Sequence, residues 1–142
     1  MLFRSDEGCS PSISLNSYAW SVNNGDDINA SSNYSTGLTE FTITNNSGGA
    51  VDISISAANM TGGLQWTLDD NGSPGDMIYG MFAGLEGEDY HTIVKLNTPY
   101  NTFVSGLADS GTQNFGLRMR TPTNFDDGED KTCNVTLTVV CS

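Results

Sequence analysis

The stretch Phe41-Thr-Ile-Thr-Asn-Asn-Ser-Gly-Gly-Ala-Val-Asp-Ile-Ser-Ile55 decides the fold class of this chain. On each side of a polar centre, apolar residues occupy every second position, which is the period of a half-buried β-strand. The centre, residues 45–49, combines side chains that tolerate positive φ with two glycines, as a tight turn requires. The stretch therefore predicts a hairpin of two β-strands joined by a short turn.

The same alternation continues in both directions along the chain. Short apolar–polar runs cover residues 12–22, 38–44, 51–55, 64–68, 77–85, 90–96, 115–119 and 132–140, with a further apolar pair at 103–104. Turn residues separate these runs, and no window repeats apolar residues with helical spacing. The sequence predicts an all-β fold of about eight or nine short antiparallel strands with little or no helix, as a sandwich or a barrel. An open Greek-key sandwich is the favoured form.

The balance of charge excludes several classes of function. The 142 residues include 5 Lys and Arg against 17 Asp and Glu, a formal net charge of -12. Proteins that bind nucleic acid or an anionic membrane surface need cations, so neither is an expected partner. Acid–base and nucleophilic catalysis often depend on histidine and on cationic side chains. This chain has one histidine and few cationic residues. We therefore expect a protein that is not an enzyme.

The length corresponds to one domain, and no linker or internal repeat divides the chain. We expect an N-terminal arm over residues 1–11 and a β-sandwich domain over residues 12–142. Residues 1–10 contain no apolar segment typical of a signal peptide. This pattern predicts either that a leader has been removed or that the protein leaves its cell by another route, such as lysis by a virus.

Several of these runs resemble parts of a known group of modules. The quoted stretch around residues 45–49 resembles a strand–turn–strand segment of immunoglobulin-like modules in the abnormal-spindle/Hydin/PapD-like group. Residues 13–22 are similar to the first strand of these modules, and residues 115–139 are similar to their closing part, whereas residues 64–108 depart from them. The resemblance implies an immunoglobulin-like Greek-key sandwich that serves as a scaffold or binding module, as in virion and surface structural proteins.

The three cysteines allow more than one pairing. Cys133 and Cys141 share one predicted strand, which separates their Cα atoms by about 26 Å, whereas a disulfide needs about 7 Å or less. The resemblance implies a first strand that runs parallel beside the last one, and this arrangement favours a disulfide between Cys9 and Cys133. An antiparallel arrangement favours Cys9 with Cys141 instead, and a reducing compartment leaves three free thiols.

An acidic loop in the middle of the chain offers oxygen ligands at alternate positions. Asp69, Asn71 and Ser73, with Asp76 beyond them, form part of a calcium-loop pattern. Gly80 occupies the position at which such loops carry a bidentate acidic residue. The alternative is that these are ordinary turn residues. Calcium is the one cofactor that the sequence indicates.

Aromatic side chains indicate another kind of candidate site. The residues concerned are Trp20, Trp66, Tyr79, Tyr90 and Tyr100. Such residues form either a platform that stacks on a sugar ring or, more often, part of a hydrophobic core. His91 has no nucleophile or cation near it in the sequence, so we expect it to face solvent or the edge of the core.

These patterns predict a non-enzymatic structural protein on a virion surface or in an extracellular location. The favoured hypothesis is a capsid decoration protein, or a related virion-surface subunit, that assembles in many copies with itself or with a major capsid or fibre subunit. Leu2 and Phe3 of the arm then anchor the chain on a neighbour, unless the arm is simply a disordered end. The alternatives are a secreted fibril or cell-surface adhesin subunit, and a carbohydrate-binding module.

Overall fold

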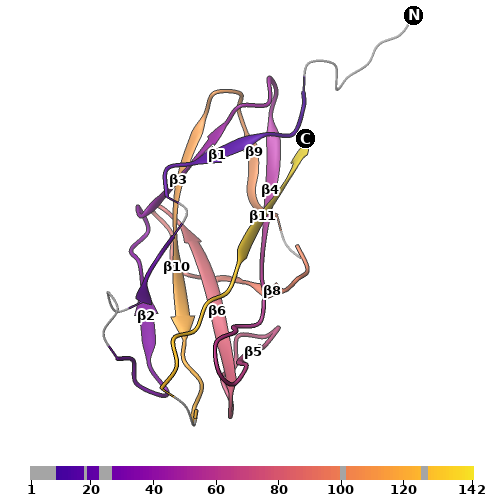
Figure 1. The fold of residues 1–142 in the computed structure, drawn as a ribbon. Helices are drawn as coiled ribbons and strands as arrows, with labels where there is room; N and C mark the ends of the chain where they lie inside the picture. The colour runs from indigo at the N-terminus through magenta and orange to yellow at the C-terminus, as the bar shows by residue number, and fades with distance from the viewer. Residues whose placement is uncertain (1–8, 18, 23–26, 100–101, 126–127) are drawn as a thin grey trace, which may run out of the picture.

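The computed structural model describes residues 9–17, 19–22, 27–99, 102–125 and 128–142. These residues form eleven β-strands in two sheets, and the described part of the chain contains no helix. It accordingly holds no helix long and apolar enough to cross a membrane. Figure 1 shows the strands as an elongated structure of two layers. The all-β prediction is therefore confirmed.

The larger sheet contains seven strands. They are β1 (Ile13–Leu15), β2 (Asn33–Ser35), β3 (Phe41–Asn45), β5 (Thr67–Leu68), β6 (Ile78–Leu85), β7 (Thr92–Ile93) and β10 (Thr112–Arg120). β10 lies at the centre, where it pairs with β6 on one side and with β3 and then β2 on the other. β1 pairs with β3 and forms one edge of this sheet.

The smaller sheet contains four strands. They are β4 (Val51–Ala57), β8 (Lys95–Leu96), β9 (Thr102–Leu107) and β11 (Val135–Cys141). β4 pairs along its whole length with β11, and its other side pairs with β9 and then β8. β11 therefore forms an edge of the smaller sheet.

The strand inventory differs from the sequence prediction in two details. The described residues hold more strands than expected, because β2 lies in a segment with no predicted run, and the predicted run at residues 90–96 is divided into β7 and β8. The pairings β4–β8 and β5–β6 are parallel, and neither was expected. The predicted first strand, residues 12–22, is reduced to β1.

The core lies between the two sheets and is formed by the alternate apolar residues that the sequence pattern identified. Fully buried side chains of the larger sheet include Ile43, Tyr79 and Met119, and those of the smaller sheet include Val51 and Ile53. Phe115 of the larger sheet packs on Phe103 of the smaller one, with 5.3 Å between ring centroids. Burial of each such side chain stabilises the fold by about 1.5–3 kcal/mol.

β6 is buried on both faces, as its sequence suggests, and glycines make this possible. A Cβ atom on Gly80 would lie 2.7 Å from the carbonyl oxygen of Gly72, so the acidic loop can approach the strand only because the residue is glycine. On β10, a Cβ atom on Gly116 would lie 2.0 Å from the carbonyl oxygen of Gly37. Loops thus cover the outer face of the larger sheet.

The turn predicted at residues 45–49 is confirmed, but its two strands do not pair with each other. β3 belongs to the larger sheet and β4 to the smaller one, so the turn carries the chain from one layer to the other. The edges of β3 are occupied by β1 and β10, and those of β4 by β11 and β9. This crossing determines which chain segments meet at the same end of the molecule.

Candidate functional site

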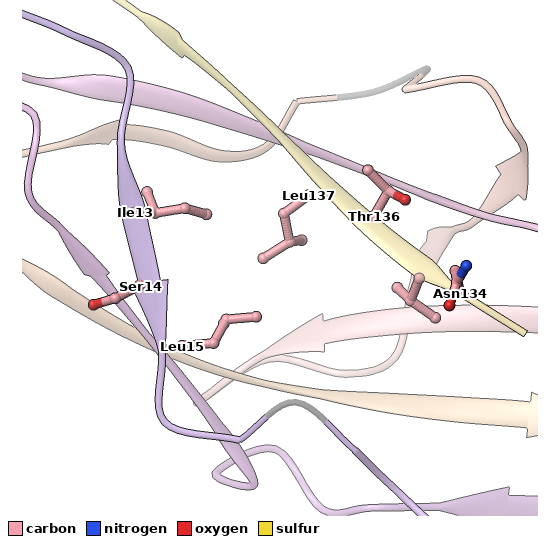
Figure 2. Close-up of a pocket in the computed structure, with 7 residues that line it drawn as sticks. Ile13, Ser14, Leu15, Asn134, Thr136 and Leu137 are labelled. Carbon is pink, nitrogen blue, oxygen red and sulfur yellow. The ribbon is translucent and has the colours of Figure 1, made fainter.

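A groove opens between the edge strands β1 and β11, one from each sheet. It has a volume of about 460 Å³ and is lined by Ile13, Ser14, Leu15, Asn134, Val135, Thr136 and Leu137. Figure 2 shows the side chains of Ile13, Leu15 and Leu137 directed into the space between the two strands. None of the lining residues carries a charge. We call this feature the β1–β11 groove.

The apolar side chains of the β1–β11 groove are only half-buried. Leu15 and Leu137 are of this kind, whereas Ile43 and Ile53, one strand further into each sheet, are 0% exposed. The difference arises because no other strand among the described residues closes the gap between the two sheet edges. These half-exposed apolar side chains are therefore accessible to contact with another segment of chain.

The backbone of β11 is also open along this side. Ala58 N–H donates to Asn134 O, and Ser142 N–H donates to Ala50 O, so the even-numbered residues of this segment face β4. Residues of an antiparallel strand alternate in the direction of their backbone groups. Val135, for example, directs its N–H and C=O away from β4, toward a side with no partner strand in the described chain.

The backbone of β1 follows the same rule. Asn46 N–H donates to Ser12 O, and Asn16 N–H donates to Thr42 O, so the even-numbered residues here face β3. The backbone groups of Ile13 and Leu15 therefore point outward. Both walls of the groove thus combine apolar side chains with outward-facing hydrogen-bonding groups.

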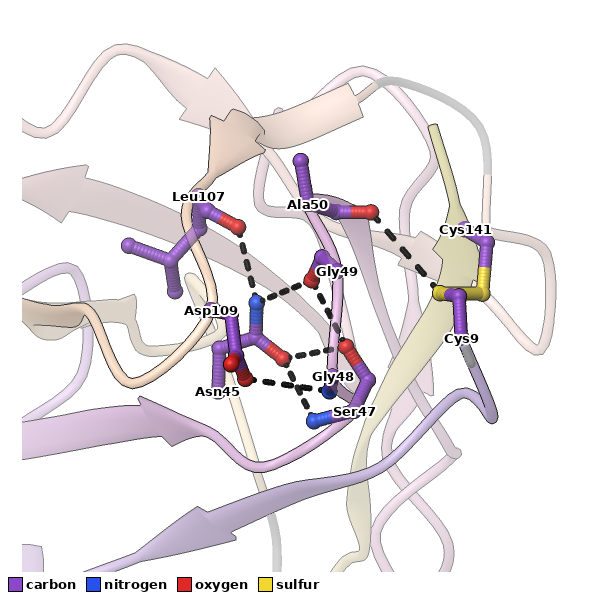
Figure 3. Close-up of a disulfide and its surroundings, with 9 residues drawn as sticks. All are labelled: Cys9, Asn45, Ser47, Gly48, Gly49, Ala50, Leu107, Asp109 and Cys141. Carbon is purple, nitrogen blue, oxygen red and sulfur yellow. Dashed lines mark hydrogen bonds between the residues drawn. A yellow bond between two sulfur atoms is a disulfide. The ribbon is translucent and has the colours of Figure 1, made fainter. Parts of the chain in front are cut away.

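One end of the same two strands is closed by a disulfide between Cys9 and Cys141, whose Cα atoms are 6.2 Å apart (Figure 3). The predicted pairing of Cys9 with Cys133 is wrong, and Cys133 is a free thiol. β1 is antiparallel to β3 and β11 is antiparallel to β4, while the turn between β3 and β4 reverses the chain. The start of β1 therefore meets the end of β11, which is the antiparallel alternative.

Asn45 organises the turn beside this disulfide. Its side-chain amide is buried and donates to the carbonyl oxygens of Gly49 and Leu107, each at 2.8 Å. Its oxygen accepts from the backbone N–H of Ser47 at 2.9 Å and from the hydroxyl of Ser47 at 2.6 Å. Sequence reasoning identified this residue only as a turn former. We call Asn45, its turn and the Cys9–Cys141 disulfide the sealed end.

The free thiol of Cys133 lies away from the sealed end, before the start of β11. Burial raises its pKa, and a hydrogen bond with the hydroxyl of Tyr79 partly offsets this effect. Burial also raises the pKa of Tyr79, whose hydroxyl donates to Ala58 O. The thiol is therefore protonated at neutral pH, a state in which cysteine is a poor nucleophile.

The residues of the predicted calcium loop have structural partners. One carboxylate oxygen of Asp69 accepts from the backbone N–H groups of Asn71 at 2.9 Å and Ser73 at 2.8 Å. Asp76 accepts from the side-chain amide of Asn124 at 3.2 Å. No group of three or more His, Cys, Asp and Glu side chains gathers for a metal within the described ranges. Calcium binding by Asp69, Asn71, Ser73 and Asp76 stays a prediction.

The candidate aromatic platform is divided between core and surface. Trp66 is 2% exposed and Tyr79 is 0% exposed, so neither can stack on a sugar. Trp20 is half-buried against the core. The hydroxyl of Tyr90 accepts from the backbone N–H of Gly37 at 2.8 Å. Tyr100 lies outside the described residues.

Two other candidate features have different outcomes. His91 is exposed, as expected, and its Nε2 lies 3.7 Å from a carboxylate oxygen of Glu88. Leu2 and Phe3, the predicted anchors of the arm, lie outside the described residues. Sequence reasoning missed the β1–β11 groove, although β11 did carry a signal: a long alternating strand with neither charge nor proline.

Comparison with protein-family models gives no match, and comparisons with curated proteins and with solved structures give none either. The structure therefore establishes an all-β protein with two sheets, and no family assignment accompanies it.

Proposed function

We propose that this chain is a non-enzymatic structural subunit that assembles in many copies on the surface of a virion, as a capsid decoration protein or a related subunit. The observation that carries the proposal is the pair of open sheet edges, β1 and β11, on either side of an apolar groove. Proteins usually protect such edges with charges or proline, and β11 has seven residues with neither. An edge of this kind is suited to pairing with another chain.

The disulfide supports an extracellular-type location. The bond between Cys9 and Cys141 fits an oxidising environment, because the cytosol of most cells keeps thiols reduced. A virion that is exposed after release from its host meets this condition. The disulfide also joins residues 132 positions apart, so it holds both ends of the domain together outside the cell.

The remaining parts of the proposal rest on charge and topology. The net charge of -12 supports copies of the chain, or a capsid or fibre subunit, as partners rather than nucleic acid or membrane. The two layers, and the turn that crosses between β3 and β4, support an immunoglobulin-like sandwich of the PapD-like kind.

A subunit of a secreted fibril or adhesin is the second candidate. The same disulfide supports it, and a strand added at a sheet edge also links subunits into filaments. A carbohydrate-binding module has less support, because Trp66 and Tyr79 belong to the core.

Native mass measurement and electron imaging of the species that contains this chain in its natural source test the proposal. We expect regular multiple copies on a shell, and a filament would instead favour the fibril candidate. A free monomer in that source would contradict both candidates. Activity of the purified chain on a substrate, lost on His91→Ala with the fold intact, would contradict the non-enzymatic assignment.

A further inference from the structure

The β1–β11 groove has the geometry of a site for an extended peptide segment. Its apolar side chains repeat at every second residue on each wall: Ile13 and Leu15 on β1, Val135 and Leu137 on β11. An extended segment places its side chains with the same period. A segment with apolar residues at positions i and i+2 therefore matches both walls.

The walls also supply main-chain hydrogen bonds. The outward-facing N–H and C=O groups of Val135 and Leu137 are arranged as they would be for another strand of the smaller sheet. Strand addition gains affinity from such bonds and specificity from the pockets between alternate side chains. Because the lining is uncharged, no charged side chain of the groove loses water when the segment enters.

We infer that the occupant is residues 1–8 of the N-terminal arm of a second copy of this chain, and this inference rests on the proposed assembly function. The described chain begins at Cys9, so this part of the arm is absent from the described structure. Met1 and Phe3 are apolar at positions i and i+2, and an extended arm directs both to one side. Phe3 is the larger of the two and enters the groove, while Leu2 faces the opposite side.

The length of the arm suits this role. Eight extended residues span about 26 Å, whereas the four residues of the β11 wall, 134–137, span about 13 Å. The arm can therefore fill the groove and still connect to its own domain.

The position of the sealed end favours binding of the arm to a neighbouring copy over binding to its own chain. The disulfide holds Cys9 beside Cys141, and β1 runs from there along one wall of the groove. An arm that entered its own groove would have to reverse direction directly beside the disulfide. The groove of a second copy requires no such reversal.

This contact joins two different surfaces and is therefore heterologous. Each copy that receives an arm still has its own arm to donate, so the contact continues until a ring closes or a filament grows. A ring fits a symmetric site on a shell, and an open filament fits a fibre. We expect native mass spectra of the associated protein to show a closed ring or an open series that continues beyond the dimer.

A trapping experiment between two full-length variants tests the inference. Both carry Cys133→Ser; the donor adds Ser5→Cys, which shares a face with Phe3, and the acceptor adds Leu137→Cys. The two are mixed and oxidised gently with oxidised glutathione. A control acceptor carries Val140→Cys instead, because Val140 is 52% exposed and faces away from the groove on the same strand.

We expect a covalent donor–acceptor dimer with Leu137→Cys at a yield at least about tenfold above that with Val140→Cys. Adding Phe3→Ser to the donor removes its apolar anchor and should lower the yield by roughly tenfold or more. Leu2→Ser should change the yield much less. Circular dichroism confirms that each variant is folded, and Val135→Cys replaces Leu137→Cys if the latter does not fold.

Three results would overturn the inference. One is an equal yield with Leu137→Cys and Val140→Cys, and another is no dimer with Leu137→Cys or Val135→Cys in a folded acceptor. The third is a cross-link formed only within a chain that carries both Ser5→Cys and Leu137→Cys, which would place the arm in its own groove. If trapping fails while the native species is an assembly, only this inference fails. A monomeric native species contradicts the proposed function itself.

Discussion

The sealed end and the β1–β11 groove lie along the same two strands but differ in almost every physical property. At the sealed end, Cys9 and Cys141 are covalently joined and the buried amide of Asn45 makes four hydrogen bonds. In the groove, Leu15 and Leu137 remain half-exposed and the backbone edges face outward. We therefore expect the sealed end to contribute more to stability than the groove, where we propose that a partner binds.

Removing the disulfide tests the stabilising half of this contrast and should have the largest effect. We expect the double variant Cys9→Ser, Cys141→Ser to lose about 2–5 kcal/mol of unfolding free energy, toward the upper end because the bond closes a long loop. Urea denaturation followed by circular dichroism measures the loss. Cys133→Ser is the matched control and should retain most of the stability. A larger loss for Cys133→Ser than for the double variant would contradict the pairing.

Asn45→Ala should have the next largest effect. The substitution removes four hydrogen bonds and leaves the carbonyl oxygens of Gly49 and Leu107 without this donor in a buried site. We expect a loss of about 2–4 kcal/mol in the same denaturation experiment. The neighbouring Asn46 is exposed, so Asn46→Ala should cost about 0.5 kcal/mol or less. Similar losses for the two variants would show that the turn does not depend on the buried amide.

The same contrast explains which features the sequence could predict. Alternation shows which side chains of a strand face the core, so the strands around residues 41–55 were identified correctly. Alternation does not show which strands pair with each other, because a strand has the same pattern of buried and exposed side chains whichever strand lies beside it. The separation of β3 and β4 into different sheets was therefore missed.

That missed crossing also explains the error in the disulfide. The partner of Cys9 depends on the direction of β1 relative to β11, and the β3–β4 turn sets that direction. The groove was missed for a related reason, because a sheet edge is a property of the assembled topology and not of one strand. Of the features singled out by sequence, the fold class and the turn were predicted most directly, since local chemistry determines them.

Leu137→Ala tests the open half of the contrast and should have a smaller effect on the isolated domain. Truncation of a half-buried leucine should lower the free energy of unfolding by about 1 kcal/mol, because much of its surface is already in water. Ile55, which pairs with Leu137 on β4 and is 2% exposed, is the matched control. Ile55→Ala should cost about 2–5 kcal/mol. If Leu137→Ala costs as much, the groove is part of the core and is not a surface left open for a partner.

The smallest expected effect is the pH dependence of the unfolding free energy that the free thiol of Cys133 causes. It tests whether burial of this thiol, outside the sealed end, affects stability. Burial raises the pKa of Cys133 above its ordinary value of 9.0, so the folded protein holds this proton at a pH where the unfolded chain releases it. The stabilisation is fully present below the pKa of the unfolded state and is lost as the pH rises through the folded value. Unfolding free energy should therefore fall as the pH rises above about 8.5, and less steeply in Cys133→Ala. Tyr79 adds a similar loss only at higher pH, because a tyrosine in an unfolded chain titrates near pH 10. Identical slopes for the protein and for Cys133→Ala over this interval would show that the thiol is as solvated in the fold as in the unfolded chain.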